Sequence, residues 1–226
     1  MSIYGISDFH LSFSTDKPMD VFRGWENHTE KLKQNICECV TDDDVIVIPG
    51  DISWALKLKD TLEDFRFINS LPGKKIIGKG NHDLWWESLT KMNKMCKDNG
   101  FDTITFLFNN CYETQDVAIA GSRGWFFDDT ADKKILLREA GRIETSISKA
   151  KETGKEVILF LHYPPLTTDS VCDEIMSVIK KHDIKKVYYG HIHRGAAFKA
   201  FNGEYDGIEF KCISCDMIDF KPLLIK

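Results

Sequence analysis

The chain has 226 residues, a net charge of −5 at neutral pH and a charged fraction of 29%. This length predicts one domain over residues 1–226 that buries enough surface to fold without disulfides or structural metals. The acidic balance argues against a nucleic-acid polymer as partner, and no apolar stretch approaches the 18 residues of a membrane span.

The first half of the chain alternates short apolar runs, typical of buried strands, with amphipathic patterns, typical of helices. Strands are predicted at residues 3–7, 45–48 and 75–78, and helices at residues 25–40, 54–70 and 87–99. The last two helices end at Pro72-Gly73 and at Gly100. A loop over residues 11–24 precedes the first helix, and loops of that length are often functional.

The second half opens with three short apolar runs, at residues 103–108, 111–114 and 117–121, which predict an antiparallel meander. A helix at 131–152, a strand at 157–161, a helix at 171–182 and a strand at 186–189 follow. Residues 196–201 and 208–214 predict a closing hairpin around Asn202-Gly203. The alternation of strands and helices predicts an α/β protein, packed most simply as a sandwich of two sheets.

Polar side chains that can bind metals follow five of the predicted strands. Ligands of open α/β sheets bind outside the carboxyl ends of the strands, so these side chains are expected to meet there. They are, in chain order, Asp8, His10, Asp51, Asn81, His82, Asp83, His162, His191 and His193. The two remaining histidines, His28 and His182, lie in helical patterns.

The spacing of these residues has a physical reason. Residues i and i+2 of an extended segment point the same way, so Asp8 and His10 can face one point, as can His191 and His193. Imidazole together with carboxylate suits zinc, iron or manganese. Each short motif alone is common, since Gly-Asp and Gly-Asn are usually turns, but their conjunction predicts a metal site.

One known family carries the same motifs in the same order: Asp8-x-His10, Gly50-Asp51, Gly80-Asn81-His82-Asp83, His162 and Gly190-His191-Ile192-His193. The chain therefore resembles the calcineurin-like metallophosphoesterases. The resemblance spans residues 8–193 and implies a metallo-dependent phosphatase-like fold, with two mixed sheets packed as a sandwich and flanked by helices in four layers. It also implies a dinuclear centre of manganese, iron or zinc.

The resemblance further implies a role for each motif residue. The ligands would form two groups of three joined by one bridge: Asp8, His10 and His193 for one metal, Asn81, His162 and His191 for the other, and Asp51 between them. A water or hydroxide between the metals would attack a phosphomono- or phosphodiester. His82 would protonate the leaving oxygen as general acid, oriented by Asp83.

The stretch after Asp51 departs from one branch of that family. Protein Ser/Thr phosphatases carry Asp and Arg soon after the bridging aspartate, whereas residues 52–56 here read Ile-Ser-Trp-Ala-Leu. The chain is thus more similar to the small microbial-type members. A small phosphorylated substrate is expected in place of a phosphoprotein.

Three further residues are candidates for substrate binding. Arg123 follows a predicted strand and Arg194 follows His193, and a guanidinium presents a bidentate donor fork to phosphate. A solvated turn residue, or a partner for a nearby carboxylate, is the alternative for both. Trp86 is the third candidate: of the adjacent Trp85 and Trp86, one is expected to face solvent or the cleft, with core packing as the alternative.

The chain begins without the basic start and long apolar run of a signal peptide, so a cytoplasmic protein with free thiols is expected. Cys212 and Cys215 form a C-x-x-C, but no second pair completes a zinc site, and buried thiols are preferred over a redox pair. Two other functions stay open. A non-catalytic scaffold would be expected to lack ligands or His82, and a nuclease would need a basic channel.

Overall fold

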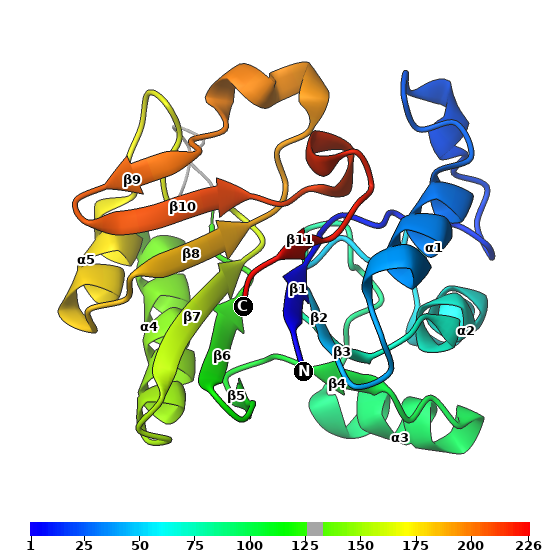
Figure 1. Ribbon diagram of the computed structural model, residues 1–226, viewed down its shortest axis with the longest axis horizontal. Helices are drawn as coiled ribbons and strands as arrows, with labels where there is room; N and C mark the ends of the chain where they lie inside the picture. The colour runs from blue at the N-terminus through cyan, green and yellow to red at the C-terminus, as the bar shows by residue number, and fades with distance from the viewer. Residues whose placement is uncertain (126–132) are drawn as a thin grey trace.

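Two β-sheets face each other, and helices cover their outer faces (Figure 1). The computed structural model describes residues 1–125 and 133–226. The strands of the first sheet are β1 (Ile3–Gly5), β2 (Val45–Ile48), β3 (Lys74–Ile77), β4 (Ile104–Phe106) and β11 (Leu223–Leu224). Their order is β11-β1-β2-β3-β4, and every pairing is parallel except that of β11 at the edge. Helices α1 (His28–Cys39), α2 (Leu62–Ser70) and α3 (Leu89–Asn99) cover its outer face.

The second sheet contains the strands of the other half of the chain. They are β5 (Cys111–Glu113), β6 (Val117–Ser122), β7 (Glu156–Leu161), β8 (Lys186–Tyr189), β9 (Gly203–Tyr205) and β10 (Ile208–Cys212). In the order β5-β6-β7-β8-β10-β9 the inner four strands are parallel, and β5 and β9 pair antiparallel at the edges. Helices α4 (Lys133–Lys151) and α5 (Asp173–Lys181) cover its outer face.

The strands β2, β6 and β7 read as nearly continuous apolar runs because both faces of each sheet are covered there. On β2, Val45 and Val47 pack into the core between the two sheets, whereas Ile46 and Ile48 pack under the helices. This follows from the alternation of side chains along a strand. The predicted fold class, a four-layer α/β sandwich of two mixed sheets, is confirmed.

Several predicted elements are wrong in partner or type. The predicted meander is split, because β4 pairs parallel with β3 in the first sheet and only β5 and β6 form an antiparallel hairpin. Apolar alternation marks a strand but not its partner. The predicted helix at 54–70 begins later, as a short 3-10 turn, η2 (Leu58–Thr61), followed by α2. Trp54 lies before these helices, and its backbone N–H donates to the carbonyl of Leu11.

The end of the chain also differs from the prediction. Residues 196–201 lie largely in a 3-10 segment, η3 (Arg194–Lys199), and the closing hairpin turns at Asp206-Gly207, where both residues have positive φ. The strand β11 was not predicted. The predicted start of the long helix at Ala131 lies outside the described residues. None of the described helices is long and apolar enough to cross a bilayer.

Candidate metal centre

The seven predicted ligands come together at the carboxyl ends of five strands, β1, β2 and β3 of the first sheet and β7 and β8 of the second. Two groups have potential ligand atoms that all lie within 4.8 Å of one another: Asp8, His10 and His193, and Asp51, His162 and His191. The seventh residue, Asn81, adjoins the second group. Its Oδ1 lies 2.7 Å from His162 Nε2 and 2.9 Å from His191 Nδ1.

Asp51 lies between the two groups. Its Oδ2 is 3.5 Å from His162 Nε2 and 3.7 Å from His10 Nε2. Within the first group, His10 Nε2 is 3.3 Å from His193 Nε2. Asp8 Oδ1 is 4.0 Å from the former nitrogen and 3.8 Å from the latter. The Oδ2 atom of Asp51 therefore lies close to both groups of potential ligands.

Backbone strain is concentrated at these residues. Four of the seven have positive φ: Asp8 (63°), His10 (47°), Asp51 (50°) and His191 (71°). Such a conformation costs about 1–3 kcal/mol for a residue with a side chain, and it persists only where the surroundings enforce it. Here backbone bonds between the loops contribute, since the N–H of Asp8 donates to Gly50 O and that of His10 to Asp51 O.

Two motif glycines let the carboxylates approach the backbone closely. A Cβ on Gly80 would lie 2.0 Å from Asp51 Oδ1, and one on Gly190 would lie 2.4 Å from Asp8 Oδ2. The space is used for hydrogen bonds: the N–H of His82 donates to Asp51 Oδ1 at 2.8 Å, and that of His191 donates to the Asp8 carboxylate. Any larger residue at either glycine would displace a ligand.

The electrostatics favour a cation in this place. Burial, reinforced by neighbouring histidines, holds the pKa of His10 and of His162 well below the usual range, so both rings are neutral and can coordinate. Burial raises the pKa of Asp8, and burial with two neighbouring carboxylates raises that of Asp51. Buried acceptors crowded together without a cation are costly, and divalent metals would offset that cost. The donor set therefore fits two metal ions.

Asp216 completes the surroundings of His193 and was not predicted. Its Oδ1 is 2.9 Å from His193 Nδ1, and its Oδ2 accepts the N–H of Arg194 at 3.0 Å. Burial alone would lower the pKa of His193, but the hydrogen bond to Asp216 and the charge of Asp8 outweigh it and raise the pKa. A carboxylate on Nδ1 turns Nε2 towards the site. Asp216 follows β10, so the same position after a strand could have revealed it.

The structure contradicts one predicted contact, that of Asp83 with the His82 ring. The buried Asp83 carboxylate instead accepts the backbone N–H groups of Gly80, Asp51, Ile52 and Ser53, and the indole N–H of Trp85. Asp83 thus holds the loops that carry Asp51. The ring of His82 packs against Trp54, with ring centroids 4.2 Å apart, and its Nε2 lies 4.0 Å from Asp51 Oδ2.

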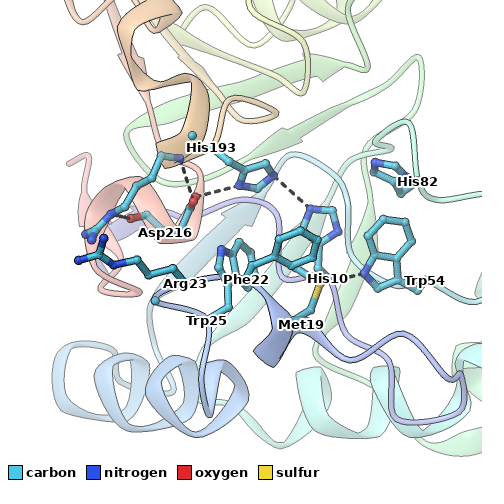
Figure 2. A pocket seen from close by; sticks show the side chains of 12 residues that line it. His10, Met19, Phe22, Arg23, Trp25, Trp54, His82, His193 and Asp216 are labelled. Atoms are coloured by element: carbon cyan, nitrogen blue, oxygen red, sulfur yellow. Dashed lines mark hydrogen bonds and ion pairs between the residues drawn. The ribbon is translucent and has the colours of Figure 1, made fainter.

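A pocket of about 800 Å³ opens beside the centre (Figure 2). Three site histidines line it, His10, His82 and His193. The residues 11–24 loop, predicted to be functional, supplies part of the wall. The other lining residues are Met19, Phe22, Arg23, Gly24, Trp25, Trp54, Arg194, Gly195 and Asp216.

Of the three predicted substrate residues, only Arg194 lines this pocket. Trp86 packs edge-on against Phe106 at 5.6 Å, so the core-packing alternative holds for it, and Trp25 and Trp54 are the tryptophans of the pocket. The guanidinium of Arg123 lies over the ring of Trp125. The backbone carbonyl of Arg123 accepts the N–H of His162. Arg123 therefore supports a ligand through its backbone.

The cysteines match the simpler of the two interpretations. All seven are free thiols, and Cys212 and Cys215 are both buried. The thiol of Cys215 donates to the carbonyl of Asp8 at 3.1 Å. Burial raises the pKa of Cys212 to about 11, so this thiol stays protonated at neutral pH.

Comparisons with known proteins agree with this geometry. A family model described as calcineurin-like phosphoesterase matches residues 1–195. Two solved structures are similar over nearly the whole chain. The protein of unknown function AQ665 from Aquifex aeolicus has a TM-score of 0.52 and 20% identity, covering 99% of this chain and 95% of that one. The protein TT1561 of Thermus thermophilus has a TM-score of 0.58 and 16% identity, covering 99% and 97%. At such identities the likeness shows the fold alone. No curated protein matched the chain.

Proposed function

Because the chain belongs to the calcineurin-like phosphoesterase family, we propose that it hydrolyses a small phosphomonoester or phosphodiester with the help of two metal ions. The observation that carries the proposal is the pair of ligand groups that share Asp51. Manganese, iron and zinc suit this mixture of imidazole, carboxylate and amide donors. Asp8, His10 and His193 would hold one ion, Asn81, His162 and His191 the other, and Asp51 both.

Two cations bound there would lower the pKa of a water molecule and offset the negative charge on the phosphoryl oxygens. The protein contributes positioning. Asp216 orients His193 through Nδ1, and Asp83 fixes the loop that presents Asp51 by accepting its backbone N–H groups. A site built on strand ends and held by such bonds needs little rearrangement when a substrate binds.

His82 is the residue that we assign to proton transfer. It lines the pocket, and its side chain is 42% exposed, whereas those of His10 and His162 are almost fully buried. Trp54 packs against its ring and sets its orientation in place of the predicted carboxylate. A positioned acid that protonates the leaving oxygen typically contributes about 10²–10⁴-fold to the rate.

The direct test is a turnover assay with metal analysis. The purified protein is assayed with 4-nitrophenyl phosphate and bis(4-nitrophenyl) phosphate in the presence of Mn²⁺, Fe²⁺ or Zn²⁺, and its metal content is measured. We expect two ions per chain, hydrolysis of at least one ester, and loss of activity on chelation. Two tightly bound ions without turnover of any ester would instead favour the non-catalytic scaffold.

A further inference from the structure

The pocket beside the metal centre has two chemically different ends (Figure 2). His82 and Trp54 lie on one side of the view, and Arg23 lies on the opposite side near Asp216. The ligands His10 and His193 lie between these ends. A molecule that fills the pocket therefore meets the reactive centre and a separate, arginine-bearing wall.

The arginine-bearing end of the pocket offers N–H donors that can bind a ligand. Within the described parts of the chain, Arg23 makes no hydrogen bond or ion pair, although a guanidinium offers five N–H donors. Arg194 is held in place, because its Nε donates to the carbonyl of Asp216 at 2.7 Å and it pairs with Asp219. A second cavity of about 280 Å³ opens at this same end, lined by both arginines and by Lys31.

The acidic groups at this end already have partners. The Asp216 carboxylate accepts from the His193 ring and the Arg194 N–H, and Asp219 pairs with Arg194. Glu26 accepts the N–H of Gly24. The exposed guanidinium of Arg23 is thus available to an external anion.

Besides His10 and His193, apolar side chains form the wall between the two ends. Met19, Phe22 and Trp25 form it, and Phe22 is 55% exposed although it is a large hydrophobic residue. A flat or apolar group laid on these side chains would be removed from water together with them, which is favourable. The pocket therefore combines metal ligands, exposed apolar side chains and arginines.

We propose that the substrate is a phosphoester with a second anionic group, a phosphate or a carboxylate, on an apolar or aromatic part of the molecule. The scissile phosphoryl group lies at the metal centre beside His82, the organic part lies against Phe22 and Trp25, and Arg23 and Arg194 bind the second anion. This inference rests on the proposed phosphoesterase function and narrows its substrate class. Arginine suits either anion, because its planar fork matches both carboxylate and phosphate.

The test compares substrates that differ only in the second anion. Adenosine 5′-monophosphate is paired with adenosine 3′,5′-bisphosphate, and phenyl phosphate with 4-carboxyphenyl phosphate. In the wild-type protein we expect kcat/KM to favour the doubly anionic member of at least one pair by about 10- to 100-fold, mainly through KM. The pair that shows the preference identifies phosphate or carboxylate as the second anion.

Variants assign the preference to residues. Arg23→Gln should reduce the advantage of the second anion by about tenfold or more, and Arg23→Lys should restore part of it as a point charge. Arg66→Gln, which removes an exposed arginine of α2 that pairs with Glu63 outside the pocket, is the matched control and should keep the advantage. Equal kcat/KM within both pairs, or an advantage untouched by Arg23→Gln, would overturn the inference while leaving the proposed function in place.

Equilibrium binding separates the two proposals. Calorimetric titration with adenosine 3′,5′-bisphosphate and adenosine 5′-monophosphate needs no turnover. If no ester is hydrolysed yet the bisphosphate binds more tightly to the wild type than to Arg23→Gln, the anion site stands and the proposed hydrolysis fails. Equal binding of the two nucleotides by the wild type, together with equal binding of phenyl phosphate and 4-carboxyphenyl phosphate, would contradict the anion site.

Discussion

Charged side chains are buried at both ends of the first sheet, and the two ends differ in the groups that surround those charges. At the beginning of β3, Lys75 is fully buried, and its Nζ donates to the carbonyls of Leu71 and Gly73 at 2.5 and 2.8 Å. At the carboxyl ends of the strands, Asp8 and Asp51 are equally buried, but they face imidazoles that burial keeps neutral.

The difference separates a structural charge from a functional one. The Lys75 ammonium donates to carbonyls that the fold itself provides, so its burial is compensated within the chain in part, and its pKa stays lowered. The cluster around Asp51 brings together atoms that can all coordinate a cation, and its compensation must come from outside the chain. Buried charge therefore indicates a ligand site only where the neighbouring groups do not complement it.

The substitution Asp51→Asn should have the largest effect, because it changes the buried charge at the candidate metal centre. It keeps the shape but removes the oxygen charge shared by both ligand groups, so we expect turnover to fall by at least about 10⁴-fold, together with loss of bound metal. Turnover and metal content measured on the same preparation check this. Asp43→Asn, in the exposed turn before β2, should leave both unchanged. Full activity of Asp51→Asn would contradict the bridging role.

His82→Ala tests whether the exposed histidine acts on substrate and not on metal. We expect turnover to fall by about 10²–10⁴-fold while both metal ions stay bound, because the His82 ring belongs to neither ligand group. His182→Ala, at the end of α5, is the control. If His82→Ala instead removes metal, the division between ligands and acid is wrong.

Lys75→Met tests the structural charge, through the pH dependence of the free energy of unfolding. Burial lowers the pKa of Lys75 from its ordinary 10.5 to about 8. Between these values the unfolded chain binds the proton and the folded chain does not, so this group makes folding more favourable as pH rises. The free energy of unfolding of the wild type, relative to Lys75→Met, should increase by up to about 3 kcal/mol from pH 8 to 10.5.

Urea unfolding of both proteins at several pH values measures this difference. Lys74→Met, which replaces the exposed neighbour on the same strand, provides the control and should show no such window. A stability difference between the wild type and Lys75→Met that stays constant or decreases over that range would show that the pKa of Lys75 is not lowered in the folded chain.

Asp216→Asn has the smallest expected effect and tests how His193 is oriented as a potential ligand. Its amide would oppose an N–H donor, either on the His193 ring or on the Arg194 backbone. We expect metal affinity to fall by about 10- to 100-fold, as for other carboxylates that orient a histidine ligand. Metal titration of the stripped protein checks this, with Asp206→Asn as control. Unchanged affinity would reduce Asp216 to a purely structural residue.

The sequence by itself determined the α/β class and the polar residues that follow the strands, and the resemblance to a known family selected seven of them as potential ligands. Both depend on local patterns, because buried strands read as apolar runs and because side chains that follow parallel strands meet at one edge. The glycines that precede Asp51, Asn81 and His191 belong to the same local patterns. The motif residues follow the strands as predicted, although the observed bounds of several strands and helices differ from the predicted bounds.

Tertiary structure alone decided which distant groups pair with one another. Periodicity shows which face of a strand is apolar but not which strand lies beside it, so the predicted meander is wrong about the partner of β4. The contact of Asp83 with backbone N–H groups, and that of Asp216 with His193, depend on loops that meet only after folding. The same holds for the meeting of Arg23 and Arg194 in one pocket, because 171 positions of chain separate them and no local pattern records that distance in space.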